Sequence, residues 1–236
     1  MLIAGYLKTS LIEWSGKICS VIFTPGCNFR CPFCHNPDLV NPDKIDKNIL
    51  KDEDETVKDL GERKKWIDAV VITGGEPTLQ NDLQDFLKRL KEMGFLTMIH
   101  TNGTRPEIIK ELIANRLVDY ICMDLKGDFE NYSKFNGVKV DMGKIKESVK
   151  LISESGLEFE FRTTVVPTLH DLPNLLKLAS QLQSITANPQ WFLQQFQSVN
   201  CFDPKFKKLK PYSKEELETF QKEIQKVIPN THLRGV

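Results

Sequence analysis

Hydrophobic and polar positions follow two alternating patterns along the chain. Short runs rich in β-branched and aromatic residues predict strands, and each run is followed by a longer segment in which apolar residues recur at helical spacing. The predicted strands cover 18–24, 69–73, 96–101, 120–125, 157–166 and 191–196. The predicted helices cover 47–60, 79–93, 106–115, 142–154, 173–183 and 214–227, and 232–236 predicts a short tail strand.

This alternation predicts an α/β fold in which parallel strands are joined by right-handed crossovers. The six strand–helix units are too few for a closed eight-stranded barrel. They favour a partial, open (β/α)6 barrel or a doubly wound sheet, and both architectures place functional sites at the carboxyl ends of the strands. Because the chain has no internal repeat or low-complexity segment, we expect one domain over residues 1–236.

Composition and charge narrow the function. The 32 basic and 32 acidic residues cancel, so a global basic field is absent and nucleic acid is not expected as a partner. No export signal is visible and no run approaches the ~20 apolar residues of a membrane span, so we expect a cytoplasmic protein. The charged segments 51–55 and 205–214 are interpreted as solvated faces and loops.

Three of the six cysteines follow the first predicted strand. Cys27, Cys31 and Cys34 have the spacing C-x3-C-x2-C. Clustered cysteines in a reducing compartment indicate metal or redox chemistry, and soft thiolates select zinc, Cu(I) or iron–sulfur clusters. A four-iron cluster with three local thiolates would leave one iron with an open coordination position.

Other interpretations of this loop stay open on spacing alone. A zinc site would add His35 as the fourth ligand, and residues 31–35 also satisfy the C-x-x-C-H pattern of haem attachment. Plain buried cysteines are a further alternative. The isolated Cys19, Cys122 and Cys201 are interpreted as small buried hydrophobic residues.

Polar residues follow the next strands. Gly74, Gly75 and Glu76 would allow close backbone approach beside an anionic acceptor, although a glycine turn before a helix is common. Asn102 and Gly103 predict a tight turn at the next strand end.

The fourth and fifth strands carry charges near their carboxyl ends. Asp124 and Lys126 are two residues apart, which predicts an ion pair on one face of the strand. On the fifth strand, Glu160, Arg162 and Thr164 alternate with apolar residues. This polar row predicts a strand whose carboxyl-terminal half lines a cavity; solvated charges on an edge strand are the alternative.

With these motifs in place, the chain resembles the radical S-adenosylmethionine (SAM) superfamily, whose signature is the three-cysteine spacing. The resemblance implies a partial (β/α)6 barrel and one [4Fe-4S] cluster held by Cys27, Cys31 and Cys34. SAM would chelate the unique iron. The resemblance implies that SAM is contacted by Phe33, Cys34, His35, Gly74, Gly75, Glu76, Asn102, Asp124, Leu125, Lys126, Arg162 and Thr164.

Within the superfamily, residues 11–40, 162–170 and 233–235 resemble the activating proteins of anaerobic ribonucleoside-triphosphate reductase. Two departures stand out. Phe196, beside Gln195, occupies a place where pyruvate formate-lyase activating enzyme has histidine, and Ser15 stands where proline is expected. The adenine end of the SAM site is therefore left open, as is the role of Cys201.

The resemblance implies a mechanism. A reduced cluster would deliver one electron to SAM, and the resulting 5′-deoxyadenosyl radical would take hydrogen from a glycine Cα of a partner glycyl-radical enzyme. Reduced flavodoxin or ferredoxin is the expected electron donor. Two rival hypotheses are a radical SAM enzyme acting on a small molecule, such as a nucleotide precursor, and a non-catalytic zinc-binding module.

Overall fold

The computed structural model describes residues 1–187 and 189–236, and the described chain divides into two compact units. The first comprises residues 1–28, 38–101 and 107–121, and the second comprises 29–37, 102–106 and 122–236. β5 (Tyr120–Asp124) begins in the first unit and ends in the second. The single domain expected over 1–236 stays a prediction, and each unit is described separately.

The first unit is built on a hairpin followed by parallel strands. β1 (Gly5–Ser10) pairs antiparallel with β2 (Cys19–Thr24). β2 pairs parallel with β3 (Ala69–Gly74), which pairs parallel with β4 (Leu96–Thr101). The register aligns Thr24 with Gly74, so the loops that follow β2 and β3 leave the sheet side by side.

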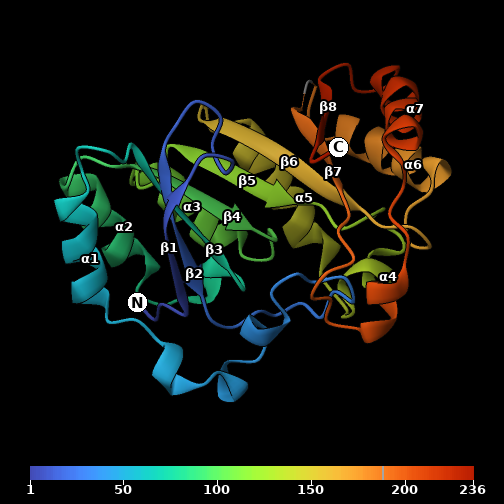
Figure 1. The fold of residues 1–236 in the computed structure, drawn as a ribbon. Helices are drawn as coiled ribbons and strands as arrows, with labels where there is room; N and C mark the ends of the chain where they lie inside the picture. Colours follow the sequence, from blue (N-terminus) through green and yellow to red (C-terminus); the bar gives the residue numbers. More distant parts are fainter. Residues whose placement is uncertain (188) are drawn as a thin grey trace. The chain divides into compact units, whose positions relative to one another are not determined.

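Helices cover this sheet. α1 (Glu53–Glu62) and α2 (Leu83–Glu92) pack on one face of the strands, and α3 (Pro106–Ala114) precedes β5 (Figure 1). Short 3-10 turns occupy Pro37–Leu39, Pro42–Lys44, Lys47–Ile49 and Pro77–Leu79. Val70, Val71 and Ile72 of β3 are fully buried, which contributes up to about 1.5–3 kcal/mol per side chain.

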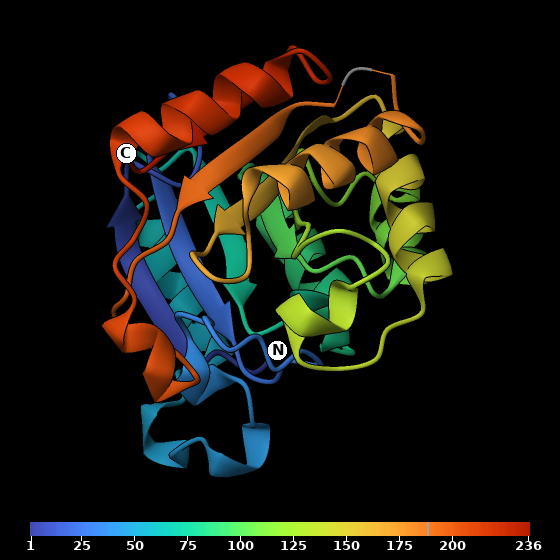
Figure 2. The same ribbon diagram turned by 90° about the vertical axis from the view of Figure 1, so that its right-hand side faces the viewer.

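The second unit contains three parallel strands in chain order. β6 (Glu158–Val165), β7 (Trp191–Gln195) and β8 (Thr231–Arg234) are neighbours. Its helices are α4 (Tyr132–Asn136), α5 (Met142–Ser153), α6 (Leu172–Gln183) and α7 (Lys214–Gln225), with a 3-10 turn at Pro204–Lys208. α6 contacts α7, and Figure 2 shows α7 lying along β7.

Local sequence explains where these helices begin. A capping box joins Ser213 and Glu216 at the start of α7. The Asp171 side chain accepts a hydrogen bond from the Asn174 N–H at the start of α6. Each cap satisfies backbone donors that the first helical turn leaves without a partner.

The predicted strands are all present, and the differences lie at the helix ends. The helix predicted from residue 47 begins at Glu53, because Asp52 caps it and three carboxylates occupy its first turn. Residues 51–55 are mostly exposed, as expected of a solvated face, and Glu53–Glu55 form the first turn of the predicted helix. The helix predicted from 79 begins at Leu83 after a 3-10 turn, and the sequence analysis missed β1 and α4.

The cysteines outside the motif behave as expected. Cys19, Cys122 and Cys201 are all buried.

None of the described helices combines the length and apolar composition that a membrane crossing needs.

Candidate functional site

The cysteine motif is divided between the two units. Cys27 lies in the first unit, where its N–H donates to the Val40 carbonyl at 3.1 Å. Cys31 and Cys34 lie in the second, where the Cys34 N–H donates to the Cys31 carbonyl at 3.0 Å and closes a tight turn. All three thiols are free of disulfides.

The turn around Cys34 is partly shielded from solvent. Burial raises the pKa of the Cys34 thiol, and the positive charge of Lys126 partly opposes that shift. Phe33 is buried, whereas the His35 ring stacks on Phe196 with 6.2 Å between ring centroids. Burial lowers the pKa of His35, whose Nε2 lies 3.0 Å from the Gln197 carbonyl oxygen.

The glycines after β3 allow two backbones to meet. A Cβ at Gly75 would lie 2.0 Å from the Gly26 carbonyl oxygen, and the Glu76 N–H donates to that oxygen at 2.8 Å. Gly74 has φ +109°, a region that favours glycine. These contacts explain the residue types in the Gly74–Glu76 motif and fix the loop that carries Cys27.

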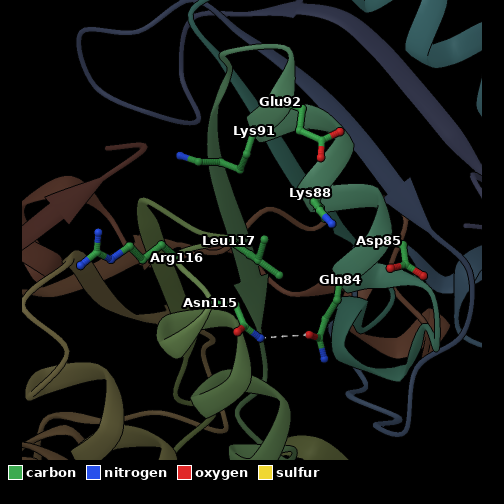
Figure 3. Close-up of a pocket in the computed structure, with 8 residues that line it drawn as sticks. All are labelled: Gln84, Asp85, Lys88, Lys91, Glu92, Asn115, Arg116 and Leu117. Atoms are coloured by element: carbon green, nitrogen blue, oxygen red, sulfur yellow. Dashed lines mark hydrogen bonds between the residues drawn. The ribbon is translucent and has the colours of Figure 1, made fainter.

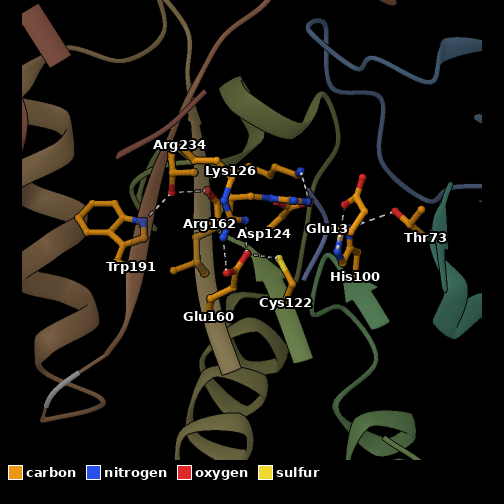
Figure 4. Close-up of polar contacts among 12 residues, drawn as sticks. Glu13, Thr73, His100, Cys122, Asp124, Lys126, Glu160, Arg162, Trp191 and Arg234 are labelled. Carbon is orange, nitrogen blue, oxygen red and sulfur yellow. Dashed lines mark hydrogen bonds and ion pairs between the residues drawn. The ribbon is translucent and has the colours of Figure 1, made fainter. Parts of the chain in front are cut away.

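Glu76 is buried and its Oε1 is held by neutral donors. The Thr101 hydroxyl donates at 2.7 Å, and the hydroxyl and N–H of Thr78 donate at 2.5 and 3.1 Å. Preorganised hydrogen bonds of this kind fix the carboxylate rotamer. In the same unit, His100 Nδ1 lies 3.2 Å from the Thr73 hydroxyl (Figure 4).

Asn102 and Gly103 form the predicted turn. The Asn102 Oδ1 accepts from the Thr104 N–H at 3.1 Å and from its hydroxyl at 2.7 Å. Gly103 has φ +75°, and a Cβ there would lie 2.1 Å from the Met123 Cε. Ser148 donates to the Gly103 carbonyl at 2.7 Å, so the turn is held to α5.

Asp124, Lys126 and Arg162 form a charged cluster in the second unit, which we call the Asp124 cluster (Figure 4). The Lys126 Nζ lies 3.1 Å from the Asp124 Oδ2, and the Arg162 Nε lies 2.8 Å from the Asp124 Oδ1. The predicted ion pair is confirmed, with Arg162 as a second cation. The three side chains keep 15–20% of their surface exposed, so a ligand can reach them.

Lys126 is held as an ammonium close to the cysteine turn. Burial lowers the pKa of Lys126, but the negative charges of Asp124 and of a Cys31 thiolate raise that pKa by more, so the net direction is upward. Two cations facing one carboxylate leave an excess positive charge. Such a site suits a carboxylate ligand.

Tyr132 and His170 fix the backbone of Lys126, which the sequence analysis did not foresee. The Lys126 N–H donates to the Tyr132 hydroxyl at 3.1 Å, and the Lys126 carbonyl lies 2.9 Å from the His170 Nε2. The Val166 N–H donates to the His170 Nδ1 at 3.1 Å, so Nε2 carries the proton and donates. His170 also contacts the ring of Phe33 at 6.4 Å between centroids.

β6 carries a second ion pair beside the Asp124 cluster. Glu160, 2% exposed, accepts two hydrogen bonds from Arg234 of β8 at 2.5 and 2.7 Å. The Cys122 thiol donates to the Glu160 Oε1 at 3.2 Å (Figure 4). Glu160 and Arg162 therefore both make charged contacts on one face of β6, and the cavity expected from this polar row stays a prediction. Thr164 lies half-buried on the same face.

The other predicted positions are structural neighbours of these groups. Leu125 is buried, its N–H donates to the Arg162 carbonyl at 2.8 Å and its carbonyl accepts from the Thr163 hydroxyl at 2.8 Å. The Gln195 Nε2 donates to the Tyr212 carbonyl at 2.6 Å, and Phe196 is fully buried.

A separate pocket lies on the first unit. It has a volume of about 580 Å³ and lies against α2 and the residues that follow α3 (Figure 3). Its lining includes Lys88, Asn115 and Arg116 and shares no residue with the predicted site.

The donor set fits a cluster chemically. Three cysteines that form no disulfide supply soft thiolates, the ligand type of iron–sulfur centres. Among the described residues, no group of three or more His, Cys, Asp and Glu side chains converges on a candidate metal-ion site. The assignment of Cys27, Cys31 and Cys34 as ligands stays a prediction.

Residues 21–179 match the family model of the radical SAM superfamily, and the chain belongs to that superfamily. The match begins in β2 and ends in α6, so it includes the cysteine motif, Gly74–Glu76 and the Asp124 cluster. The chain is thus an enzyme of the radical SAM type. The family implies a [4Fe-4S] cluster and SAM as cofactors, which agrees with the cofactors expected from the motif.

Named relatives extend along the whole chain. A protein of Methanocaldococcus jannaschii, named as a glycyl-radical enzyme activating enzyme, is 34% identical over 100% of this chain and 96% of its own length. Pyruvate formate-lyase-activating enzyme of Clostridium pasteurianum is 30% identical over 92% of this chain and 90% of its own length.

Solved structures share the fold. Streptococcus suis SuiB bound to its precursor peptide aligns with TM-score 0.66 and 19% identity, covering 91% of this chain. This chain spans 48% of the SuiB chain. SuiB bound to SAM aligns with TM-score 0.62. The α/β fold predicted from the sequence is confirmed, and it is consistent with a partial barrel of parallel strands.

Proposed function

We propose that this chain, as a single radical SAM domain over 1–236, is an activating enzyme that installs a glycyl radical on a partner enzyme. The observation that carries the radical SAM part is the Asp124 cluster, whose Lys126 is electrostatically coupled to Cys31 in the cysteine turn. The activating role is supported by the names of relatives that align over 96% and 90% of their own lengths.

The proposal assigns roles to the predicted residues. Cys27, Cys31 and Cys34 would hold the cluster. SAM would be contacted by the side chains or backbone of Phe33, Cys34, His35, Gly74, Gly75, Glu76, Asn102, Asp124, Leu125, Lys126, Arg162 and Thr164. When bound and reduced, the [4Fe-4S] cluster would supply one electron for reductive cleavage of SAM at its C5′–S bond, and the hydrogen atom taken in the reaction would come from a glycine Cα of the partner.

The residues of the chain contribute binding and orientation. Lys126 and Arg162 would bind the SAM carboxylate, because these two cations carry one more positive charge than the Asp124 carboxylate balances. Tyr132 and His170 hold the Lys126 backbone, so the ammonium meets its ligand with little loss of conformational freedom. The buried Glu76 carboxylate, with its rotamer fixed, suits the SAM amino group.

The client enzyme, the electron donor and the cellular location are also proposed. Anaerobic ribonucleoside-triphosphate reductase is the proposed client, supported by the resemblance of residues 11–40 and 233–235 to its activating proteins. Reduced flavodoxin or ferredoxin is the proposed electron donor. A cytoplasmic location is part of the proposal, supported by six cysteines that form no disulfide, as is usual in reducing compartments.

An anaerobic assay tests the function. Reconstituted protein is incubated with reduced flavodoxin, SAM and a candidate anaerobic ribonucleotide reductase, and the reductase is examined by EPR. We expect a glycyl doublet on the reductase and stoichiometric 5′-deoxyadenosine. Cleavage of SAM only when a small metabolite is added would overturn the activating role.

A matched pair of variants tests the ligands. Cys31→Ser should abolish both the acid-labile sulfide and SAM cleavage, whereas Cys122→Ser, which changes a buried cysteine outside the motif, should retain both. Equal sulfide in the two variants would contradict the assignment of Cys31. One zinc per chain without iron uptake would favour the zinc-binding module.

A further inference from the structure

The segment that follows β7 lies against the cysteine turn. The Asp203 N–H donates to the Pro32 carbonyl at 2.8 Å, and the Asn200 Nδ2 donates to the His35 carbonyl at 3.2 Å. His35 in turn contacts the Gln197 carbonyl. Three hydrogen bonds therefore attach residues 197–203 to Pro32, inside the turn between Cys31 and Cys34, and to His35, immediately after it. In Figure 2 this segment and the turn that follows it are drawn in orange to orange-red.

Cys201 lies in the same segment, shortly before the lysines that follow it in sequence. The thiol is 3% exposed, and it interacts electrostatically with both Cys34 and Lys207. The 3-10 turn Pro204–Lys208, capped by the Asp203 side chain, starts immediately afterwards. The lysines of this turn are therefore anchored close to the cysteine turn rather than carried on a free tail.

Residues 199–210 concentrate positive charge in a chain whose net charge is zero. The segment holds Lys205, Lys207, Lys208 and Lys210 against one carboxylate, Asp203. All four lysines are exposed, and none forms an ion pair with another described residue. A local excess of one sign without internal partners attracts an oppositely charged surface and speeds its encounter.

Exposed apolar side chains accompany the lysines. Val199 is 69% exposed and Phe202 is 42% exposed, although both flank the buried Cys201. An aromatic and an aliphatic side chain inside a basic rim have the composition of a small transient interface. The hydrogen bonds from the Asp203 N–H to Pro32 and from the Asn200 side chain to His35 hold the segment in place, so little ordering would be needed on binding.

We propose that residues 199–210 are the docking surface for an acidic one-electron donor protein. The inference rests on the proposed function, because it takes Cys31 and Cys34 as cluster ligands. The docked donor is oxidised by one electron, the cluster is reduced by one electron, and no proton is transferred. A donor seated on this segment would lie beside the cysteine turn, and the lysines would select acidic donors by charge complementarity.

The test uses the cluster-loaded full chain and an acidic flavodoxin as probe. We compare the wild type with a Lys205→Glu, Lys207→Glu, Lys208→Glu variant. Binding of oxidised flavodoxin, measured by biolayer interferometry without turnover, should weaken at least about 10-fold at low ionic strength, and the difference should shrink at 0.5 M salt. SAM cleavage driven by subsaturating reduced flavodoxin should fall in proportion, whereas cleavage driven by dithionite should not change.

A charge-matched control separates local from global effects. The Lys139→Glu, Lys144→Glu, Lys150→Glu variant makes the same charge change at exposed lysines at and near α5, and it should bind flavodoxin within about 2-fold of the wild type. Equal weakening in both variants would overturn the surface. Weakened binding of the glycyl-radical enzyme with flavodoxin binding intact would also overturn it, assigning the segment to the client.

The outcomes also separate this inference from the proposed function. Loss of dithionite-driven cleavage in the wild type itself would defeat the radical SAM role of the site. Normal dithionite-driven cleavage, with flavodoxin binding equal in the wild type and the lysine variant, would defeat only the docking surface. Val199→Ser with Phe202→Ser should weaken flavodoxin binding without changing its salt dependence, because apolar contacts are not screened.

Discussion

The charged groups around Asp124 and around Glu160, both in the second unit, differ in what they can do. In the Asp124 cluster, one carboxylate meets two cations and the side chains stay 15–20% exposed. At Glu160, one carboxylate that is 2% exposed meets Arg234 through two parallel hydrogen bonds. The first arrangement has positive charge to offer a ligand, whereas the second satisfies its own charges. Closely similar residue types thus give one site suited to binding and one suited to stability.

The largest expected effect is on the pH dependence of stability and concerns His170, which holds the backbone of Lys126 in the Asp124 cluster. The folded chain holds the pKa of His170 at about 4, below its ordinary 6.5, because the ring is buried, although hydrogen bonds to the backbone of Lys126 and Val166 oppose the shift. The unfolded chain therefore binds more protons between these values. The stability is fully present above about pH 6.5 and decreases by about 3 kcal/mol as the pH falls to 4.

Denaturant unfolding measured across pH 4–7.5 checks this expectation. A His170→Phe variant, which keeps the aromatic volume, should be less stable at pH 7 and should show a shallower decrease toward pH 4. Parallel pH profiles of the two proteins would contradict the role assigned to His170.

The next effect separates binding from stability. Lys126→Met should raise the dissociation constant of SAM about 30-fold, or about 2 kcal/mol, because a charge-assisted hydrogen bond to the SAM carboxylate is lost. Calorimetric titration of cluster-loaded protein measures it, with iron content as the control. Wild-type affinity in this variant would remove Lys126 from the SAM site.

Glu160→Gln should give the reverse result. We expect the free energy of unfolding to fall by about 1.5–2 kcal/mol, because Arg234 loses its charged acceptor, while SAM affinity stays within about 2-fold. Glu158→Gln, at an exposed position two residues earlier on β6, is the matched control and should change neither quantity. A large loss of SAM affinity in the Glu160 variant would mean that the two ion pairs are not separable.

The smallest expected effect tests whether the geometry of the Glu160–Arg234 ion pair, in addition to its charge, contributes to stability. Arg234→Lys keeps the charge but loses the two-pronged contact with Glu160 and the stacking over Phe192, where the guanidinium lies 4.0 Å from the ring centroid. We expect a loss of about 1 kcal/mol in the free energy of unfolding. An unchanged free energy of unfolding would show that a positive charge at position 234 is enough to hold β8 without the guanidinium geometry.

The sequence predicted the strands well because each is a continuous apolar or alternating run, and β3 is an example with four fully buried residues. It predicted helix starts less well. Leu79 continues the apolar spacing of α2, yet Pro77 and the Glu76 cap produce a 3-10 turn before that helix. β1 escaped notice because three of its six residues are exposed, so its pattern is weak.

The site residues follow the same rule: a contact between residues close in sequence could be predicted, whereas contacts between distant residues could not. Asp124 and Lys126 could be paired because they lie two residues apart at the end of one predicted strand. Arg234 could not be paired with Glu160, because the two residues are 74 positions apart and no local pattern connects them. His170 was also missed as a support for Lys126, since a lone histidine four residues after a strand carries no periodic signal.

The contact between Gly75 and Gly26 has a consequence for how the first cysteine acquires its position. Where two main chains touch with no room for even a methyl group, neither loop can lengthen, shorten or shift without displacing the other. The placement of Cys27 is then inherited from the strand register of β2 and β3 rather than from its own loop. A side chain at position 75 would therefore misplace a sulfur atom without altering any residue that carries one.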